Sequence, residues 1–256
     1  MKIQIKKVDE KRGIVQITTT DERWYQKGDV FVPSVTWIAG FYPKGIPFYK
    51  WLAEKGWDEA EAIKSAAGDK GSKVHRAVED IVAGKKVKMD DKYLNPSTQE
   101  MEELTPDEYE CIYWFVDWIN TVQPKIISNE VVVFNEKEGY AGTVDLVCEI
   151  KGRKFIVDVK TAQSLWPEYE LQISAYKHAS QKPEDYNLAI LQIGYRRNSI
   201  KKWKFTEMED KFDLFLSAKK IWANETNGIM PLQRDYPLIL EWDKKQEPKV
   251  AAKKSN

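Results

Sequence analysis

The stretch GTVDLVCEIKGRKFIVDVKT, residues 142–161, decides how the fold is interpreted, because it contains two apolar runs around a tight turn. Both runs are rich in β-branched residues and predict the two strands of a β-hairpin. Yet Asp145, Asp158 and Lys160 lie inside these strands, where a core strand should carry no charge. The hairpin is therefore the first place to look for a functional site.

The register of this hairpin follows from its turn. If Gly152 and Arg153 are the central turn residues, Gly at the first of them predicts a type II′ turn. In that register Asp145 lies opposite Lys160, and Asp158 lies on the same face, roughly 6–7 Å from Lys160 along the strand. A slip by one residue would separate the three charges. The opposite face is apolar and consists of Val144, Leu146, Phe155, Val157 and Val159.

The three charges allow two interpretations. A bare D…DxK pattern is often only a surface ion pair, in which Lys160 offsets Asp145. Two carboxylates in a partly buried site, however, repel each other unless a cation neutralises them. Because the opposite face of the hairpin is apolar, the pattern favours a divalent-metal site, in which the lysine orients a water or stabilises a charged oxygen.

The composition excludes several classes of protein. The 256 residues include 40 Lys plus Arg and 40 Asp plus Glu, so any DNA-binding surface must be local. Cys111 and Cys148 are the only cysteines, and their apolar neighbours predict reduced core thiols. No apolar run approaches the roughly 20 residues that span a membrane. The N-terminus does not resemble a signal peptide, so we expect a cytoplasmic protein.

The surrounding segments predict an α/β fold with a mixed sheet packed between helices. An amphipathic helix is expected over 72–84, with Ser72 as its cap and Gly84 at its end. A second helix is expected over 167–180, and the polar residues 85–104 are expected to form a loop. Strands are expected at 2–8, 13–20, 130–134, 141–150, 153–160, 187–195 and 200–206.

Two capping boxes predict where further helices begin. Thr105 and Glu108 enclose the start of TPDEYECIYWFVDWINTV, which is expected to be helical. Thr206 and Glu209 are expected to cap a helix over 207–224.

Four more side chains are candidates for the same site. His75 lies at the edge of an apolar helical stripe and is expected to face inward, although a half-buried core histidine fits the pattern too. Gln172 and Tyr176 are four residues apart and share one helical face, which could equally be the solvated face. Glu130 begins an apolar strand and is either an outer ligand or a strand-edge charge.

Assembled in order, these residues resemble the RecB-type branch of the PD-(D/E)xK nuclease superfamily. The resemblance covers roughly residues 30–205, and VPSVTWI resembles a segment of helicase-free members, including phage exonucleases and the mitochondrial genome maintenance exonuclease. The matching residues are His75 in GSKVHRAVE, Glu130 in NEVVV, Gly142 and Asp145 in GTVDLV, Asp158 and Lys160 in VDVKT, and Gln172 and Tyr176 in QISAY.

The resemblance implies a site for Mg²⁺ or Mn²⁺, and imidazole suits Mn²⁺ somewhat better. The implied metal ligands are His75, Asp145, Asp158 and the carbonyl of Val159. The implied catalytic residues are Asp145, Asp158, Lys160, Gln172 and Tyr176. Lys160 would position the attacking water and stabilise the transition state, and Glu130 would be an outer ligand. No cysteine set for an iron–sulfur cluster and no Walker motif is present, so we expect neither a cluster nor a fused helicase.

The resemblance also implies a restriction-endonuclease-like mixed β-sheet flanked by helices, with an N-terminal β-hairpin and helical additions. The expected regions are an N-terminal hairpin (1–30), the nuclease domain with helical insertions (31–242) and a basic, disordered tail (243–256). The implied activity is that of a metal-dependent DNA exonuclease that prefers single strands or DNA ends. The alternatives are a flap-, nick- or junction-cleaving endonuclease and a non-catalytic DNA-binding assembly protein. Replication or recombination proteins are expected partners, in the host cytoplasm if the chain is virus-encoded.

Two groups of basic residues are expected to contact DNA. The first flanks His75 and consists of Lys70, Lys73 and Arg76. The second could instead be a solvated strand edge; it consists of Arg196, Arg197, Lys201, Lys202 and Lys204. Aromatic residues upstream could stack on unpaired bases, although most aromatic clusters are core; they are Trp37, Phe41, Tyr42, Tyr49 and Trp51.

Overall fold

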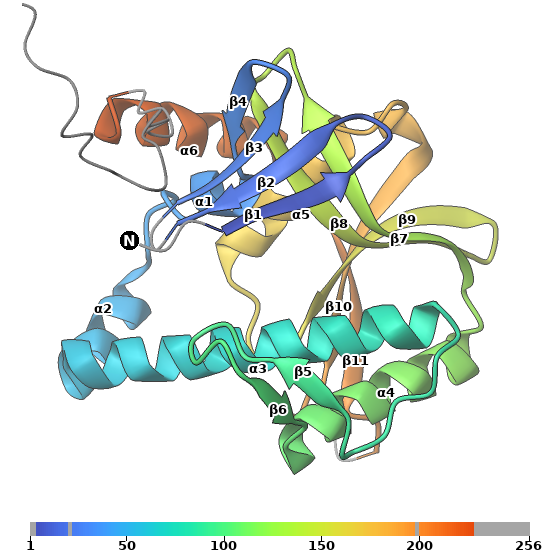
Figure 1. Cartoon of the computed structure of the whole chain (residues 1–256). Helices are drawn as coiled ribbons and strands as arrows, with labels where there is room; N and C mark the ends of the chain where they lie inside the picture. Colours follow the sequence, from blue (N-terminus) through green and yellow to red (C-terminus); the bar gives the residue numbers. More distant parts are fainter. Residues whose placement is uncertain (1–3, 20–21, 198–199, 228–256) are drawn as a thin grey trace, which may run out of the picture.

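A five-stranded sheet runs through the centre of the molecule (Figure 1). The structure is a computed structural model that describes residues 4–19, 22–197 and 200–227. In the order β11-β10-β9-β8-β7, only β9 and β10 are parallel neighbours, so the sheet is mixed, as predicted. The strands are β7 (Lys125–Asn135), β8 (Tyr140–Ile150), β9 (Arg153–Lys160), β10 (Tyr186–Ile193) and β11 (Trp203–Met208).

Helices cover both faces of this sheet, which confirms the expected layered α/β architecture. One face carries α1 (Val35–Ala39), α5 (Pro167–His178) and α6 (Phe212–Glu225). The other face carries α3 (Trp57–Val82) and α4 (Pro106–Val122), whereas α2 (Ile46–Lys55) projects beside the start of α3. A short 3₁₀ helix, Pro183–Asp185, precedes β10. Four residues of the predicted apolar face of the hairpin pack towards α3 and α4: Leu146, Phe155, Val157 and Val159. The fifth, Val144, packs in the core on the opposite face of the sheet, under α1, α5 and α6.

The N-terminal strands form a sheet of their own. Strands β1 (Gln4–Asp9) and β2 (Ile14–Thr18) form the predicted hairpin. The hairpin is only half of a four-stranded antiparallel sheet, which β3 (Arg23–Lys27) and β4 (Val30–Pro33) complete. The expected boundary at residue 30 therefore falls at the first residue of β4. This sheet packs on β7 and β8 through a small core of Ile14, Tyr25, Val32, Val132 and Ala141.

The register of the β8–β9 hairpin differs from the predicted one. Ile150 pairs with Arg153, so the central turn residues are Lys151 and Gly152. Both have positive φ, 51° and 76°, as a type I′ turn requires. The prediction assigned the first turn position to Gly152, whereas Lys151 occupies it.

The register error is an even number of residues, so the side chains of the paired residues keep their predicted faces, whereas Val144, beyond the last pair, packs on the other face. Leu146 pairs with Val157 at the end of the ladder nearest the site. The next residues beyond this pair are Asp145 and Asp158, so the predicted opposition of Asp145 and Lys160 is wrong.

Helix α3 is far longer than the predicted helix over 72–84. Ser72 does not cap it but lies inside it, where its Oγ donates a hydrogen bond to the carbonyl of Gly68 at 2.9 Å. Gly84 follows the end of the helix with φ 79°, as predicted. The expected loop 85–104 contains a short hairpin of β5 (Lys92–Leu94) and β6 (Met101–Glu103).

One capping box is confirmed and the other is wrong. The Glu108 N–H donates to Thr105 Oγ1 at 3.3 Å and the Thr105 N–H donates to Glu108 Oε2 at 2.8 Å. Thr206, by contrast, pairs with Ile190 inside the sheet, so β11 continues past it and α6 begins only at Phe212.

Cys111 and Cys148 are buried free thiols, as predicted. Burial raises the pKa of Cys148 to about 12, so this thiol is inert at neutral pH. Within the described ranges, the helices lack the combination of length and apolarity needed to cross a membrane. The predicted tail 243–256, residues 228–242 and the turn 198–199 lie outside the described residues.

Candidate active site

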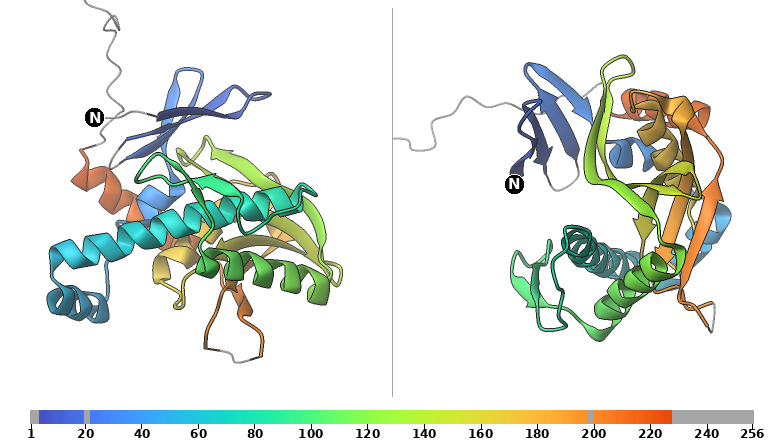
Figure 2. Two further views of the ribbon diagram at one scale, coloured as in Figure 1. Left: turned by 60° about the horizontal axis from the view of Figure 1, so that its bottom comes forward. Right: turned by 90° about the vertical axis from the view of Figure 1, so that its right-hand side faces the viewer.

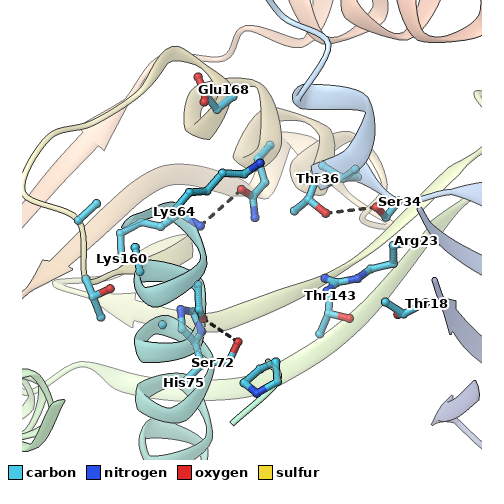
Figure 3. Close-up of a pocket in the computed structure, with 18 of the residues that line it drawn as sticks. Thr18, Arg23, Ser34, Thr36, Lys64, Ser72, His75, Thr143, Lys160 and Glu168 are labelled. Carbon is cyan, nitrogen blue, oxygen red and sulfur yellow. Dashed lines mark hydrogen bonds between the residues drawn. The ribbon is translucent and has the colours of Figure 1, made fainter. Parts of the chain in front are cut away.

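A groove with a volume of about 1790 Å³ is lined by residues of the N-terminal sheet and of α3. Figure 2 shows where these two parts of the backbone lie. Strands β1–β3 and α1 supply one wall, α2 and α3 supply the other, and β7–β9 with α5 form the floor. Figure 3 shows Lys64, Ser72 and His75 on α3 and, across from them, Thr18, Arg23, Ser34 and Thr36, with Thr143 between. The expected site residues that line the groove are His75, Glu130, Asp145, Lys160, Gln172 and Tyr176.

Three metal-ligating side chains meet in this groove, and we call them the acidic cluster: His75, Glu130 and Asp145. Their ligand atoms all lie within 4.8 Å of one another. His75 Nδ1 is 3.6 Å from Asp145 Oδ1, which is too far for a hydrogen bond. Ligands about 2.1 Å from one ion lie about 3–4 Å apart, so small side-chain movements would let the cluster bind one cation.

The Asp145 carboxylate is held in place by the neighbouring strand. The backbone N–H of Val159 donates to Asp145 Oδ2 at 2.8 Å. The other oxygen, Oδ1, is left to face His75. A ligand oriented in this way by a second hydrogen bond is preorganised for a metal.

Glu130 reaches the cluster through a distortion of β7. Its φ is 49°, in the left-handed region, and the β7–β8 ladder pairs the residues on either side of it but not Glu130 itself. Burial raises the pKa of Glu130 to about 7, and the nearby Asp145 carboxylate adds to this rise. From the sequence, Glu130 could be either an outer ligand or a strand-edge charge. The structure brings it together with His75 and Asp145.

A second group of residues forms a hydrogen-bonded network beside the cluster. Lys160 Nζ lies 2.7 Å from Asp158 Oδ2 and donates to Gln172 Oε1 at 3.4 Å. Gln172 Nε2 donates to Asp158 Oδ1 at 3.1 Å and to the Tyr176 hydroxyl at 2.8 Å. The sequence therefore predicted correctly that Gln172 and Tyr176 share a face. The network fixes the position of the Lys160 ammonium.

The electrostatics of the network keep Lys160 charged. Burial lowers the pKa of Lys160, but the carboxylates of Asp158 and Asp145 raise it further, so the pKa lies above its usual value. Burial raises the pKa of Asp158 to about 6, although Lys160 opposes this rise. At neutral pH Lys160 is thus a fixed positive charge rather than a proton acceptor.

Asp158 differs from the prediction in its surroundings. Its side chain is 1% exposed and is not one of the convergent ligands of the acidic cluster, whereas Glu130 is. Its Oδ2 accepts no hydrogen bond of regular geometry, although Lys160 is close by. Among the described residues, the acidic cluster offers two carboxylates and one imidazole, and this set of donors fits Mg²⁺ or Mn²⁺.

Of the first basic group, Lys70 and Arg76 line the groove. Lys73 does not, because it is 3% exposed and pairs with Glu108 at 3.0 Å and Glu102 at 3.4 Å. It lies on the face of α3 that packs against α4, so the expectation that it contacts DNA is wrong.

The second basic group is not brought to the groove. Arg196 pairs with Asp107 at 2.8 Å, and Lys202 pairs with Glu110, both on α4. Arg197 donates to Ser164 Oγ at 3.1 Å. The group members that lie outside the lining of the groove are Arg196, Arg197, Lys201, Lys202 and Lys204.

The aromatic residues divide between two places. Trp37, Phe41 and Tyr42 pack against the core under α1 and α6, whereas Tyr49 and Trp51 line the groove. The sequence did not predict several other lining residues, because isolated hydroxyl-bearing and basic side chains form no recognisable motif. They include Lys6, Arg23, Ser34, Thr36, Lys64 and Thr143.

No family model matches this chain, and no curated protein matches it significantly in sequence. Any proposal about activity therefore depends on the residues of the groove.

Proposed function

We propose that this protein is a divalent-metal-dependent DNA exonuclease that hydrolyses phosphodiester bonds and prefers single strands or DNA ends. The observation that carries the proposal is the convergence of His75, Glu130 and Asp145 beside the Lys160 ammonium in one groove. The mixed sheet between helices agrees with the restriction-endonuclease-like fold implied by the resemblance to RecB-type nucleases.

The acidic cluster would hold Mg²⁺ or Mn²⁺. Asp145 is the central ligand in this proposal, with His75 and Glu130 beside it. Asp158 and the carbonyl of Val159 are the further ligands that the resemblance implies. When bound, such an ion lowers the pKa of a coordinated water and neutralises phosphate oxygens.

The remaining residues position charge and protons. Lys160 would stabilise the negative charge that develops on the phosphate oxygens in the transition state. Gln172 and Asp158 hold its ammonium in place. Burial, together with the nearby Asp145 carboxylate, raises the pKa of Glu130 to about 7 without metal, so cation binding would displace a proton from it near neutral pH.

Cleavage of linear and circular single-stranded DNA tests this function. We expect wild-type protein to degrade end-labelled linear strands with Mg²⁺ or Mn²⁺, to leave circles intact, and to be inactive in EDTA. Cleavage of the circles would instead indicate an endonuclease. Binding without any cleavage would favour a non-catalytic DNA-binding protein and would contradict the proposal.

A further inference from the structure

One wall of the groove carries aromatic side chains that belong to no core. Helix α2 has no buried residue, and Tyr49 and Trp57 are 56% and 68% exposed. Large apolar rings gathered at the surface of a groove usually mark a binding site. We call this set the aromatic shelf: Phe48, Tyr49, Trp51 and Trp57, all of which line the groove.

The opposite wall is basic. Lys6, Lys7 and Arg23 line the groove from β1 and β3, and in the part of the chain that the structure describes no carboxylate forms an ion pair with them. Three other acidic side chains of the lining are each paired with a lysine or an arginine: Glu61, Glu79 and Glu168. Outside the acidic cluster, the charge that remains unpaired in the groove is therefore mainly positive.

The shelf and the acidic cluster lie along one helix. Trp57 and His75 are both on α3, and at 1.5 Å per residue they are about 27 Å apart. A stacked strand rises about 3.4 Å per nucleotide, so about eight nucleotides would bridge this distance.

The part of α3 between them is open. Ala67, Gly68, Gly71 and Ser72 line the groove there. A Cβ atom on Gly68 or Gly71 would meet no atom within 4 Å, so the packing of the protein does not require glycine at either position. A strand could pass close to the helix backbone at this point.

We propose that the groove binds one unpaired strand, with its bases stacked on the aromatic shelf and its phosphates facing Lys6, Lys7 and Arg23. This inference rests on the proposed function, because it takes the ligand of the groove to be the DNA that the site cleaves. The two unlike walls match a single strand, which exposes base faces on one side and charge on the other. A duplex hides its base faces and presents phosphates on the outside, so the shelf would have nothing to stack on.

Fluorescence anisotropy in EDTA tests the proposal without catalysis. The probe is a fluorescein-labelled oligothymidylate of about 12 nucleotides, within the usual range of single-strand site sizes. Tyr49→Ala and Trp57→Ala should each weaken binding about fivefold to a hundredfold. The matched control is Tyr113→Ala, because Tyr113 is 58% exposed on α4 and does not line the groove. Its affinity should stay within about twofold of wild type.

The basic wall is tested in the same assay. Lys6→Gln should reduce the slope of log affinity against log salt by about one. Lys125→Gln should not change it, because Lys125 is an exposed residue at the start of β7 and lies outside the groove. A labelled duplex of equal length should bind at least about tenfold more weakly than the single strand.

Several results would overturn this inference. They are equal binding of duplex and single strand, no binding of the oligothymidylate by wild type, or equal loss in Tyr49→Ala and Tyr113→Ala. Circular dichroism checks that the variants fold, which the exposure of Tyr49 and Trp57 leads us to expect. If the shelf variants weaken binding but wild type does not cleave DNA in Mn²⁺, the proposed function is wrong and this inference stands. If wild type cleaves DNA but the shelf variants bind as tightly as wild type, this inference is wrong and the proposed function stands.

Discussion

At the scale of single residues, the placement of Glu130 is costly in two ways. A left-handed φ of 49° costs a residue with a Cβ about 1–2 kcal/mol, and burial of its carboxyl adds to that cost. In this placement the carboxylate lies within 4.8 Å of ligand atoms of Asp145 and His75. Strain of this kind concentrates at functional sites, where the surrounding structure maintains it.

Glu130→Gly should separate stability from metal binding. Glycine adopts the left-handed conformation without strain, so the variant should be at least as stable as wild type in EDTA, by up to about 1 kcal/mol. The rise in melting temperature that Mn²⁺ gives to wild type should be largely lost. Thermal unfolding with and without Mn²⁺ measures both effects, and a full Mn²⁺ shift in the variant would contradict a ligand role for Glu130.

The raised pKa values predict how metal-free stability changes with pH. Glu130 and Asp158 have folded pKa values of about 7 and about 6, above the roughly 4 of unfolded carboxyls. The folded state therefore binds more protons than the unfolded state over this range, and stability in EDTA should fall as pH rises from about 4 to about 7. Because a cation binds the ionised forms, the stabilisation by Mn²⁺ should grow over the same range. Chemical denaturation at several pH values checks this, and Mn²⁺ stabilisation that is constant with pH would count against the site.

The sequence motifs identified most of these residues but not their relative roles. Asp145, Lys160, Gln172 and Tyr176 come together in the structure, as their alternation and helical spacing predicted. The prominence of Glu130 was not predictable, because a positive φ in a strand depends on the distorted ladder around it.

At the scale of elements, β8 and α5 meet at a contact that only glycine allows. A Cβ on Gly142 would lie 2.5 Å from Tyr176 Cε1. Tyr176 in turn accepts a hydrogen bond from Gln172, which contacts Lys160. The approach of β8 to α5 thus sets the position of the network that holds the ammonium.

Gly142→Ala should therefore impair the site through Tyr176. We expect a loss of about 1–3 kcal/mol of stability from overpacking, and a fall in kcat with little change in KM. Gly45→Ala is the control, because Gly45 does not line the groove and its added Cβ would make only an ordinary contact, at 3.5 Å with Pro47 Cδ. Steady-state kinetics with a short single strand provide the measurement, and an unchanged kcat in Gly142→Ala would show that Tyr176 does not position the network.

The α3–α4 interface makes a different prediction for Lys73. Lys73→Met leaves the buried Glu108 carboxylate unpaired, so it should cost about 3 kcal/mol without changing the salt dependence of DNA binding. Adding Glu108→Gln should restore much of the stability, because glutamine keeps the capping box and removes the charge. Urea denaturation of the single and double variants tests this. A reduced salt slope in Lys73→Met would return Lys73 to the DNA-binding surface.

Elements with local signals were predictable, and elements that depend on long-range packing were not. The capping box of α4 and the strands β8 and β9 follow from nearby residues. The sequence predicts that this helix starts at residue 72, because Ser72 can cap a helix, whereas α3 already begins at Trp57. Thr206 and Glu209 formed a plausible cap, but pairing in the sheet takes precedence over that local preference.

At the scale of the whole molecule, the groove is a product of parts that are distant in sequence. The N-terminal sheet and α3 form the two walls of the groove on the same side of β7 and β8, which belong to its floor (Figure 2). The sequence predicted a β-hairpin where the structure has a four-stranded sheet, so it gave no indication of a second wall. The layered α/β arrangement was predictable from element order, but the walls come from tertiary packing that no local pattern encodes.

The central claim is that the acidic cluster and Lys160 together hydrolyse DNA with a divalent metal. The most direct test is the rate at which wild type, Asp145→Asn and Lys160→Met cleave an end-labelled single-stranded oligonucleotide in Mn²⁺ and in EDTA. We expect folded variants that cleave at least about a hundredfold more slowly than wild type, and no cleavage by any of the three proteins in EDTA. Near-wild-type cleavage by either variant, or cleavage that persists in EDTA, would contradict the claim.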